Sequence, residues 1–194
     1  MDYWNHNTAY YKWIKKQTTA CHAILDVGCG DGALIAYLND GSKELLGIDP
    51  EQSCIDKAHS RCKAENIAFM CLGFENLDTD RKFDAITFVA ALHHMNMKPT
   101  IEKAKSLLKD DGVLLVVGLA KPSTVIDYII EGLRVIPSSI ISRIKCMKTC
   151  ESENIPVSYD FPSMNAVRKN AKALLPGCSI KYGLFYRFLL KWTK

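Results

Sequence analysis

The run DVGCGDG at 26–32 holds the residue types that most clearly indicate ligand binding. It follows an apolar run and precedes a segment with helical spacing. Glycines permit a tight turn there and let a ligand approach the backbone closely. The run therefore predicts a ligand-binding turn between a strand and a helix.

Asp49 is a second candidate, because it stands at the end of the next apolar run. A carboxylate at such a position can accept hydrogen bonds from both hydroxyls of a ribose. The glycine-rich turn and Asp49 together predict a ligand that contains a ribose, and we expect an adenosine.

Two classes of ribose ligand fit this pattern. The spacing over 28–33 satisfies the permissive dinucleotide fingerprint, with Asp49 near the ~20 residues expected further on. A dinucleotide would place its doubly negative pyrophosphate on the turn, where Asp26 and Asp31 would repel it. S-adenosylmethionine has no phosphate and brings an ammonium and a sulfonium, which suit Asp26. The charges therefore favour S-adenosylmethionine over NAD(P).

Strands and helices alternate over the first 120 residues. Helical spacing predicts helices near 32–40, 51–64 and 99–109. Such alternation is typical of βαβ units on a parallel sheet, where ligands bind beyond the carboxyl ends of the strands. Short apolar runs predict the strands themselves, at 23–27, 44–48, 67–73, 83–89 and, after a turn at 110–112, at 113–119.

The last third has a different pattern. Residues 123–147 predict an amphipathic helical stretch interrupted at Pro137, which either covers the sheet, caps an acceptor pocket or lies on a membrane. Residues 148–162 predict a loop. Ser163 is expected to cap a helix that runs to about Leu175, and the aromatic tail predicts a hairpin or a pair of strands.

Composition limits the class of protein. The 194 residues are 48% apolar and 24% charged, which is typical of one soluble globular domain. Apolar runs stay short of the ~18 residues that a membrane span needs, and the N-terminus shows no secretory signal. Eight scattered cysteines indicate reduced thiols and a cytoplasmic location.

The charge is uneven along the chain. Residues 1–120 hold 13 basic and 16 acidic residues, whereas residues 121–194 hold 12 and 5. The basic third either forms a solvated face or meets an acidic partner. Basic and aromatic residues do not interleave, so we expect no dedicated nucleic-acid surface.

Four segments resemble, in order and spacing, the successive motifs of class I S-adenosylmethionine-dependent methyltransferases: ILDVGCGDG, GIDP, FDAITFVAALHHM and LLKDDGVLLVVGL. They cover about residues 20–120. YWNHNTAYY, ALHHM and LLKWTK are similar to a group of small bacterial methyltransferases. The resemblance implies a Rossmann-like three-layer α/β sandwich, with a seven-stranded, mostly parallel sheet and an antiparallel C-terminal strand.

The resemblance also implies which residues bind S-adenosylmethionine. Asp26 would hold the amino group and Asp49 the ribose. The other contacts are expected from Gly28, Cys29 and Gly30 (methionine part), Pro50, Phe74 and its neighbours (adenine), and Val89 and Ala90 (methionine and methyl group).

Gly73 departs from the family pattern. Similar sequences often have an Asp there, which contacts the adenine amino group. We expect either weaker cofactor binding or substitution by Glu75 or Asn76.

Methyl transfer is an in-line displacement, in which the enzyme chiefly aligns the reacting atoms. A general base is needed only where the acceptor keeps its proton at neutral pH. His93 and His94 follow the fourth predicted strand and are candidate bases. Alternatively, one of them holds the loop through hydrogen bonds.

An aromatic cluster occupies the N-terminus. It either closes over the cofactor as a lid that excludes water or forms an ordinary packing helix. Tyr10, Tyr11 or His6 is its candidate for the methyl-transfer site, and Tyr10 is the first of these. The cluster consists of Tyr3, Trp4, Asn5, His6, Tyr10, Tyr11 and Trp13.

We expect no metal site. The group Cys54, His59 and Cys62 lacks the paired spacing of structural zinc sites, and so does the pair Cys146 and Cys150. Their cysteines are interpreted as buried thiols.

The sequence thus predicts methyl transfer to O, N or C of a small-molecule acceptor, by a monomer or homodimer. The alternatives are a non-catalytic, regulatory adenosyl-ligand-binding protein and an NAD(P)-dependent oxidoreductase. We expect one domain over 1–194, made of an N-terminal lid (1–20), a cofactor-binding core (21–120), a helical substrate cap (121–162), and a helix with a strand pair (163–194).

Overall fold

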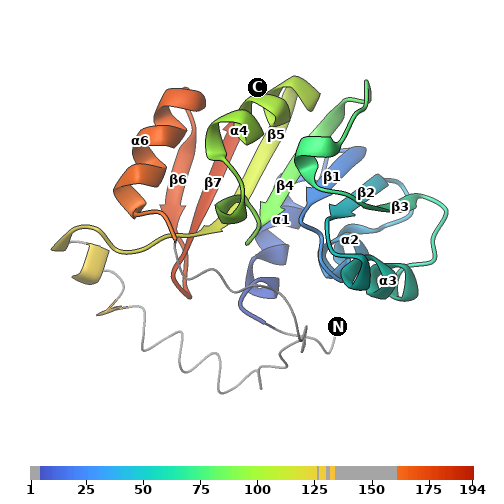
Figure 1. The fold of residues 1–194 in the computed structure, drawn as a ribbon, viewed down its shortest axis with the longest axis horizontal. Helices are drawn as coiled ribbons and strands as arrows, with labels where there is room; N and C mark the ends of the chain where they lie inside the picture. The colour runs from blue at the N-terminus through green and yellow to red at the C-terminus, as the bar shows by residue number, and fades with distance from the viewer. Residues whose placement is uncertain (1–4, 126, 130–131, 134–160) are drawn as a thin grey trace.

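The computed structural model describes residues 5–125, 127–129, 132–133 and 161–194. Its centre is a seven-stranded sheet with the order β3-β2-β1-β4-β5-β7-β6, in which neighbours lie side by side in Figure 1. The first five strands run parallel, and β7 pairs antiparallel with both β5 and β6. This confirms the predicted sheet. The strands are β1 (Ala23–Val27), β2 (Glu44–Asp49), β3 (Ile67–Cys71), β4 (Phe83–Val89), β5 (Leu108–Leu119), β6 (Ser179–Tyr182) and β7 (Arg187–Thr193).

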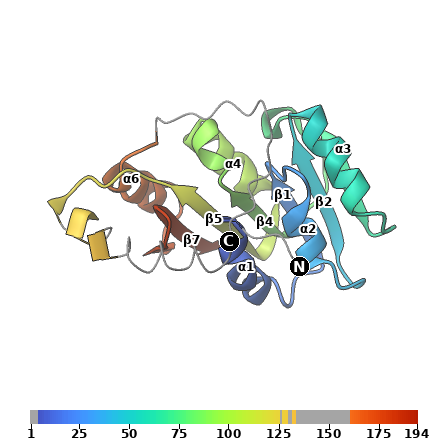
Figure 2. The same cartoon turned by 90° about the horizontal axis from the view of Figure 1, so that it is seen from below.

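Helices cover both faces of this sheet, so the molecule has three layers. Neighbouring residues of a strand point to opposite faces. Ile24 of β1 accordingly joins the apolar cluster under α1, α2 and α3, whereas Leu25 joins the cluster under α4 and α6. Figure 2 shows α4 and α6 on one side of the sheet and α1 on the other. The helices are α1 (Tyr11–Gln17), α2 (Ala33–Leu38), α3 (Gln52–Arg61), α4 (Met97–Leu107) and α6 (Met164–Leu174).

The ends of several elements differ from the sequence-based expectation. The turn expected at 110–112 is a bulge within β5, where Asp111 has a φ of 63° and the pairing with β4 shifts between Phe83 and Ala85. The strand therefore begins at Leu108, five residues earlier than expected. The predicted cap is confirmed, since the Ser163 Oγ accepts a hydrogen bond from the Ala166 N–H at 3.2 Å.

Part of the region 121–162 lies outside the described residues. Helical structure is described at 125, 127–129 and 132–133. The buried Asp127 accepts hydrogen bonds from the Ser123 hydroxyl, the Thr124 N–H and the Tyr182 hydroxyl, which join the start of this region to β6. Several sequence-based expectations fall outside the described residues. They concern most of the stretch 123–147 with Pro137, most of the loop 148–162, and Tyr3, Trp4, Cys146 and Cys150.

In the part of the chain that the structure describes, no helix combines the length and the apolar character needed to cross a bilayer.

Candidate functional site

The glycine-rich turn leaves the carboxyl end of β1 and is held against β2. The backbone N–H groups of Gly28 and Cys29 both donate to the Ile48 carbonyl, at 2.9 and 3.0 Å. These bonds fix the turn between β1 and α2. The turn therefore lies at the sheet edge where parallel α/β proteins bind ligands.

The backbone conformation and the surroundings at positions 28 and 30 show why this turn needs glycine. Gly28 has a φ of +71°, and a Cβ built on it would stand 2.5 Å from the Ala91 Cβ. Gly30 has a φ of +53°, and a Cβ there would meet no described atom within 4 Å. The first glycine allows the turn to pack on the loop after β4, and the second presents its backbone to open space.

Asp49 is tied to the same turn. Its Oδ2 accepts a hydrogen bond from the Gly30 N–H at 3.0 Å, and its Oδ1 accepts one from the Glu51 N–H at 3.0 Å. The carboxylate at the end of β2 is therefore held beside the backbone of the turn, and its contact with a ribose stays a prediction.

Asp26 is a buried carboxyl group under the turn, with 2% of its surface exposed. Burial raises its pKa to about 7, although the hydrogen bond from the Thr87 hydroxyl, at 2.6 Å, opposes this shift. The charge of Asp49 raises the pKa further. A cation that reached Asp26 would favour its ionised form.

The negative charge beside the glycine turn is smaller in the structure than the sequence suggests, so a pyrophosphate would be repelled less. Asp31 forms an ion pair with Arg61, with 2.5 Å between Oδ2 and Nη2, so its charge is balanced. Asp26, with its pKa near 7, carries less than a full charge at neutral pH. The sequence could not show either effect, because both depend on tertiary contacts.

In the loop after β3, the Glu75 side chain occupies the space beside Gly73. A Cβ built on Gly73 would overlap the Glu75 carboxylate, so this carboxylate lies where a side chain at 73 would begin. The Phe74 ring, by contrast, is 2% exposed and packs edge-on against Phe88 in the core. The Phe74 side chain is thus not free to line an adenine, and a contact with adenine stays a prediction for its backbone and its neighbours. Pro50 is exposed beside Asp49.

The loop after β4 contains backbone in an uncommon conformation. Ala90 has a φ of 54°, and its N–H donates to the Val117 carbonyl of β5 at 2.8 Å. A left-handed residue other than glycine is uncommon and persists where the surroundings hold it. Here the close approach of Ala91 to Gly28 brings this loop, which also holds Val89 and Ala90, against the glycine turn.

His93 and His94 lie in different surroundings. His94 is exposed, whereas the His93 ring packs against Phe161 at 5.1 Å between centroids. Burial, followed by the charges of His94 and Arg187, lowers the pKa of His93 to about 4. The His93 Nδ1 is buried and finds no hydrogen-bond partner among the described residues. His93 therefore presents a neutral imidazole to a cavity of about 340 Å³.

Tyr10 has a structural role, because it is buried and hydrogen-bonded. It is 8% exposed, and its hydroxyl donates to the Leu184 carbonyl at 2.6 Å. Tyr11 and Ile14 of the following helix are buried against α2 and the sheet. Tyr10 and helix α1 thus pack against the rest of the fold. The lid over the cofactor and the part of Tyr10 in methyl transfer stay predictions.

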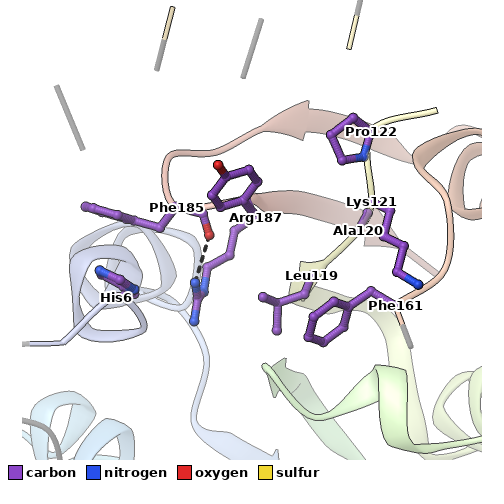
Figure 3. A pocket seen from close by; sticks show the side chains of 9 residues that line it. His6, Leu119, Ala120, Lys121, Pro122, Phe161, Phe185 and Arg187 are labelled. Atoms are coloured by element: carbon purple, nitrogen blue, oxygen red, sulfur yellow. Dashed lines mark hydrogen bonds between the residues drawn. The ribbon is translucent and has the colours of Figure 1, made fainter. Parts of the chain in front are cut away.

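A second cavity, of about 420 Å³, lies where β5 ends and β7 begins (Figure 3). The sequence did not single out Arg187, one of the basic residues that line it. Only the pairing of β7 with β5 brings Arg187 opposite Leu119, so no local pattern could have found it. The described lining consists of His6, Leu119, Ala120, Lys121, Pro122, Phe161, Phe185, Tyr186 and Arg187.

Among the residues that the structure describes, no three His, Cys, Asp or Glu side chains gather as they would around a metal ion.

Comparison with known proteins relates this site to methyltransferases. Residues 24–112 match a family described as methyltransferase domain. An uncharacterized methyltransferase of Mycobacterium tuberculosis is 27% identical over 97% of this chain and 96% of its own length. A ubiquinone biosynthesis O-methyltransferase of Coxiella burnetii is 34% identical, over 56% of this chain and 48% of its own.

Solved structures show the same fold. An N-methyltransferase from Bradyrhizobium japonicum, in complex with S-adenosylhomocysteine, has a TM-score of 0.65 at 14% identity, over 96% of this chain and 86% of its own. Magnesium protoporphyrin IX methyltransferase from Synechocystis has a TM-score of 0.63 at 16% identity, over 97% and 81%. Both likenesses cover nearly the whole of this chain.

Proposed function

We propose that this chain, whose residues 24–112 match a methyltransferase domain, is a class I S-adenosylmethionine-dependent methyltransferase that transfers a methyl group to O, N or C of a small-molecule acceptor. S-adenosylmethionine supplies the electrophilic methyl group when it is bound. The protein's own task is to hold that cofactor, to exclude water and to align the acceptor.

The observation that carries this proposal is the joining of the glycine turn to Asp49 above a buried Asp26. The open backbone at Gly30 and a carboxyl group with a pKa near 7 fit a ligand that carries an ammonium. We assign Asp26 to the amino group and Asp49 to the ribose. Gly28, Cys29 and Gly30 would line the methionine part with backbone groups.

The adenine would lie between Pro50 and the backbone at Gly73, with the Glu75 carboxylate beside it. A carboxylate there accepts a hydrogen bond from an exocyclic amino group. Glu75 can therefore replace the Asp that similar sequences have at position 73. Val89 and Ala90 would support the methionine part and the methyl group.

His93 is the candidate residue on the acceptor side. A pKa of about 4 makes its imidazole a weak base at neutral pH. Its Nδ1, which has no hydrogen-bond partner among the described residues, is instead suited to a hydrogen bond with the acceptor. We therefore propose that His93 positions the acceptor, and that exposed His94 does not.

The test of this function is methyl incorporation. The purified protein is incubated with S-adenosylmethionine carrying a labelled methyl group and with a metabolite extract. We expect a labelled small molecule with the unaltered protein and none with Gly28→Ala. If S-adenosylhomocysteine binds and no extract yields a labelled product, the non-catalytic alternative is favoured instead.

The sequence also predicts a single domain over 1–194 with four parts, a cytoplasmic location, and a monomeric or homodimeric state. These stay predictions. The small-molecule acceptor, in place of a nucleic acid, is likewise part of the proposal.

A further inference from the structure

The cavity between β5 and β7 lies at the same edge of the sheet as the glycine turn. Leu119 ends β5 and pairs with Arg187, which begins the antiparallel β7. The carboxyl ends of β1, β4 and β5 meet at this edge, and only β4 separates β1 from β5. Residues that line this cavity therefore stand beside the proposed cofactor site.

Arg187 reaches into this cavity and is held by neutral groups. Its Nε and Nη2 donate to the Asn7 Oδ1, at 3.1 and 2.6 Å, and its Nη1 donates to the Phe185 carbonyl at 2.9 Å. A guanidinium has five N–H donors. One N–H on each terminal nitrogen thus remains without a described acceptor.

The charge of Arg187 is not balanced by a described carboxylate. No Asp or Glu forms an ion pair with it within residues 5–125, 127–129, 132–133 and 161–194. Burial lowers the pKa of Arg187 to about 10, and the group keeps its proton at neutral pH. A partly buried cation without an anion is costly, so such sites usually serve an anionic ligand.

The rest of the cavity wall points to the same kind of ligand. Figure 3 shows the Arg187 guanidinium between His6 and Leu119, with Phe161 beside Leu119. Burial and the nearby Arg187 lower the pKa of His6, which favours its neutral form. Lys121 adds a second basic residue to the lining, which is otherwise mainly apolar and aromatic.

We propose that this cavity, which shares Leu119 and Phe161 with the cavity beside His93, binds the methyl acceptor, and that the acceptor carries an anionic oxyacid group, a carboxylate or a phosphate, on an apolar or aromatic body. Arg187 holds the anion through its two remaining N–H groups, because a planar guanidinium matches the paired oxygens of either group. The apolar walls hold the body. This inference rests on the proposed function and narrows its acceptor class.

Calorimetry with matched probes tests the inference. Phenylacetate, phenyl phosphate and the neutral phenylacetamide are titrated separately into protein saturated with S-adenosylhomocysteine. We expect at least one of the two anions to bind about 10-fold or more tightly than the amide, because charge-assisted bonds are the stronger ones. The tighter anion identifies the oxyacid.

Three variants locate the effect. Arg187→Gln should abolish the preference for the anion, and Arg187→Lys should keep part of it, since it keeps the charge and loses the planar fork. Lys181→Gln is the matched control, because it removes one exposed charge from the same hairpin outside the cavity. It should bind the probes as the unaltered protein does.

Binding of S-adenosylhomocysteine separates the possible failures. We expect its Kd in Arg187→Gln to stay within about twofold of the unaltered protein, which also shows that the variant is folded. A tenfold loss would overturn the inference, since Arg187 would then serve the cofactor. Equal binding of the anions and the amide, or no anion binding to a protein that binds S-adenosylhomocysteine, would also overturn it. Failure to bind S-adenosylhomocysteine at all would count against the proposed function itself.

Discussion

The Asp49 carboxylate accepts a hydrogen bond from the Gly30 N–H at 3.0 Å, which joins the end of β2 to the turn after β1. A carboxylate has lone pairs for several donors. Asp49 can therefore hold the turn and still accept hydrogen bonds from a ribose. The proposed site is built on this pair, because it gives the turn and the sugar-binding group one fixed arrangement.

Gly28→Ala should abolish cofactor binding and destabilise the fold. Alanine at a φ of +71° is strained by about 1–2 kcal/mol, and its Cβ would also collide with Ala91. Gly41→Ala is the control, because Gly41 has a φ of +81° with no described atom near its Cβ. It should show the backbone strain alone.

Urea denaturation and calorimetry with S-adenosylhomocysteine check both variants. We expect the larger loss of unfolding free energy in Gly28→Ala, and an unchanged Kd in Gly41→Ala. Equal stability losses with full cofactor binding in both would show that the turn does not pack as described.

Affinity for S-adenosylhomocysteine should rise with pH through the pKa of Asp26. Burial raises that pKa to about 7, so the carboxyl group is mostly protonated at pH 6 and mostly ionised at pH 8. Only the ionised form attracts the ligand's ammonium strongly. We expect a Kd lower by up to about 10-fold at pH 8 than at pH 6.

Asp26→Asn is the matched variant for this measurement, since it keeps the size and loses the titration. Its Kd should be higher than that of the unaltered protein at pH 8 and nearly independent of pH. A pH dependence as steep as that of the unaltered protein would assign the effect to another group.

Glu75→Ala should reduce discrimination at the adenine amino group. The Glu75 carboxylate lies over Gly73, where it can accept a hydrogen bond from that group. A bond to a charged acceptor contributes roughly 1.5–3 kcal/mol, or about 10-fold or more in Kd. The unaltered protein should therefore prefer S-adenosylhomocysteine to its inosine analogue, and Glu75→Ala should not.

Asp78→Asn is the control for a general loss of negative charge, because Asp78 is an exposed carboxylate in the loop that follows. We expect it to keep the preference for the adenosine ligand. The same weakening in both variants would indicate a long-range charge effect in place of a direct contact.

His93→Leu should reduce kcat/KM by about 10- to 100-fold on the acceptor found in the labelling experiment, since a polar contact is lost. The Kd of S-adenosylhomocysteine should not change. His94→Leu should change kcat/KM less than about twofold, because His94 is exposed. Equal losses in both variants would contradict the assignment to His93.

Strands, their order along the chain and the glycine turn were predictable because they depend on local patterns. Strand β1 is apolar at every position except Asp26, because helices cover both faces of the sheet at this strand. The bulge at Asp111 was not predictable, because a turn and a bulge use the same residues.

The site was predictable only in part. Asp26 and Asp49 follow from their places at strand ends, whereas the Arg61 partner of Asp31 and the buried Nδ1 of His93 depend on tertiary packing. Arg187 lies 68 residues beyond Leu119 in the chain and meets it only through the antiparallel pairing of β7. Such long-range pairs leave no periodic signal in the sequence.

Thermal unfolding in the presence of four ligands tests the central claim most directly. S-adenosylmethionine, S-adenosylhomocysteine, NAD and NADP are compared at equal concentrations. A ligand at ~100 times its Kd stabilises by about 2.7 kcal/mol, which raises the Tm of a chain of this size by roughly 5–10 °C. We predict a rise with the two adenosyl sulfur ligands alone. A rise with NAD or NADP, and none with S-adenosylmethionine or S-adenosylhomocysteine, would contradict the account.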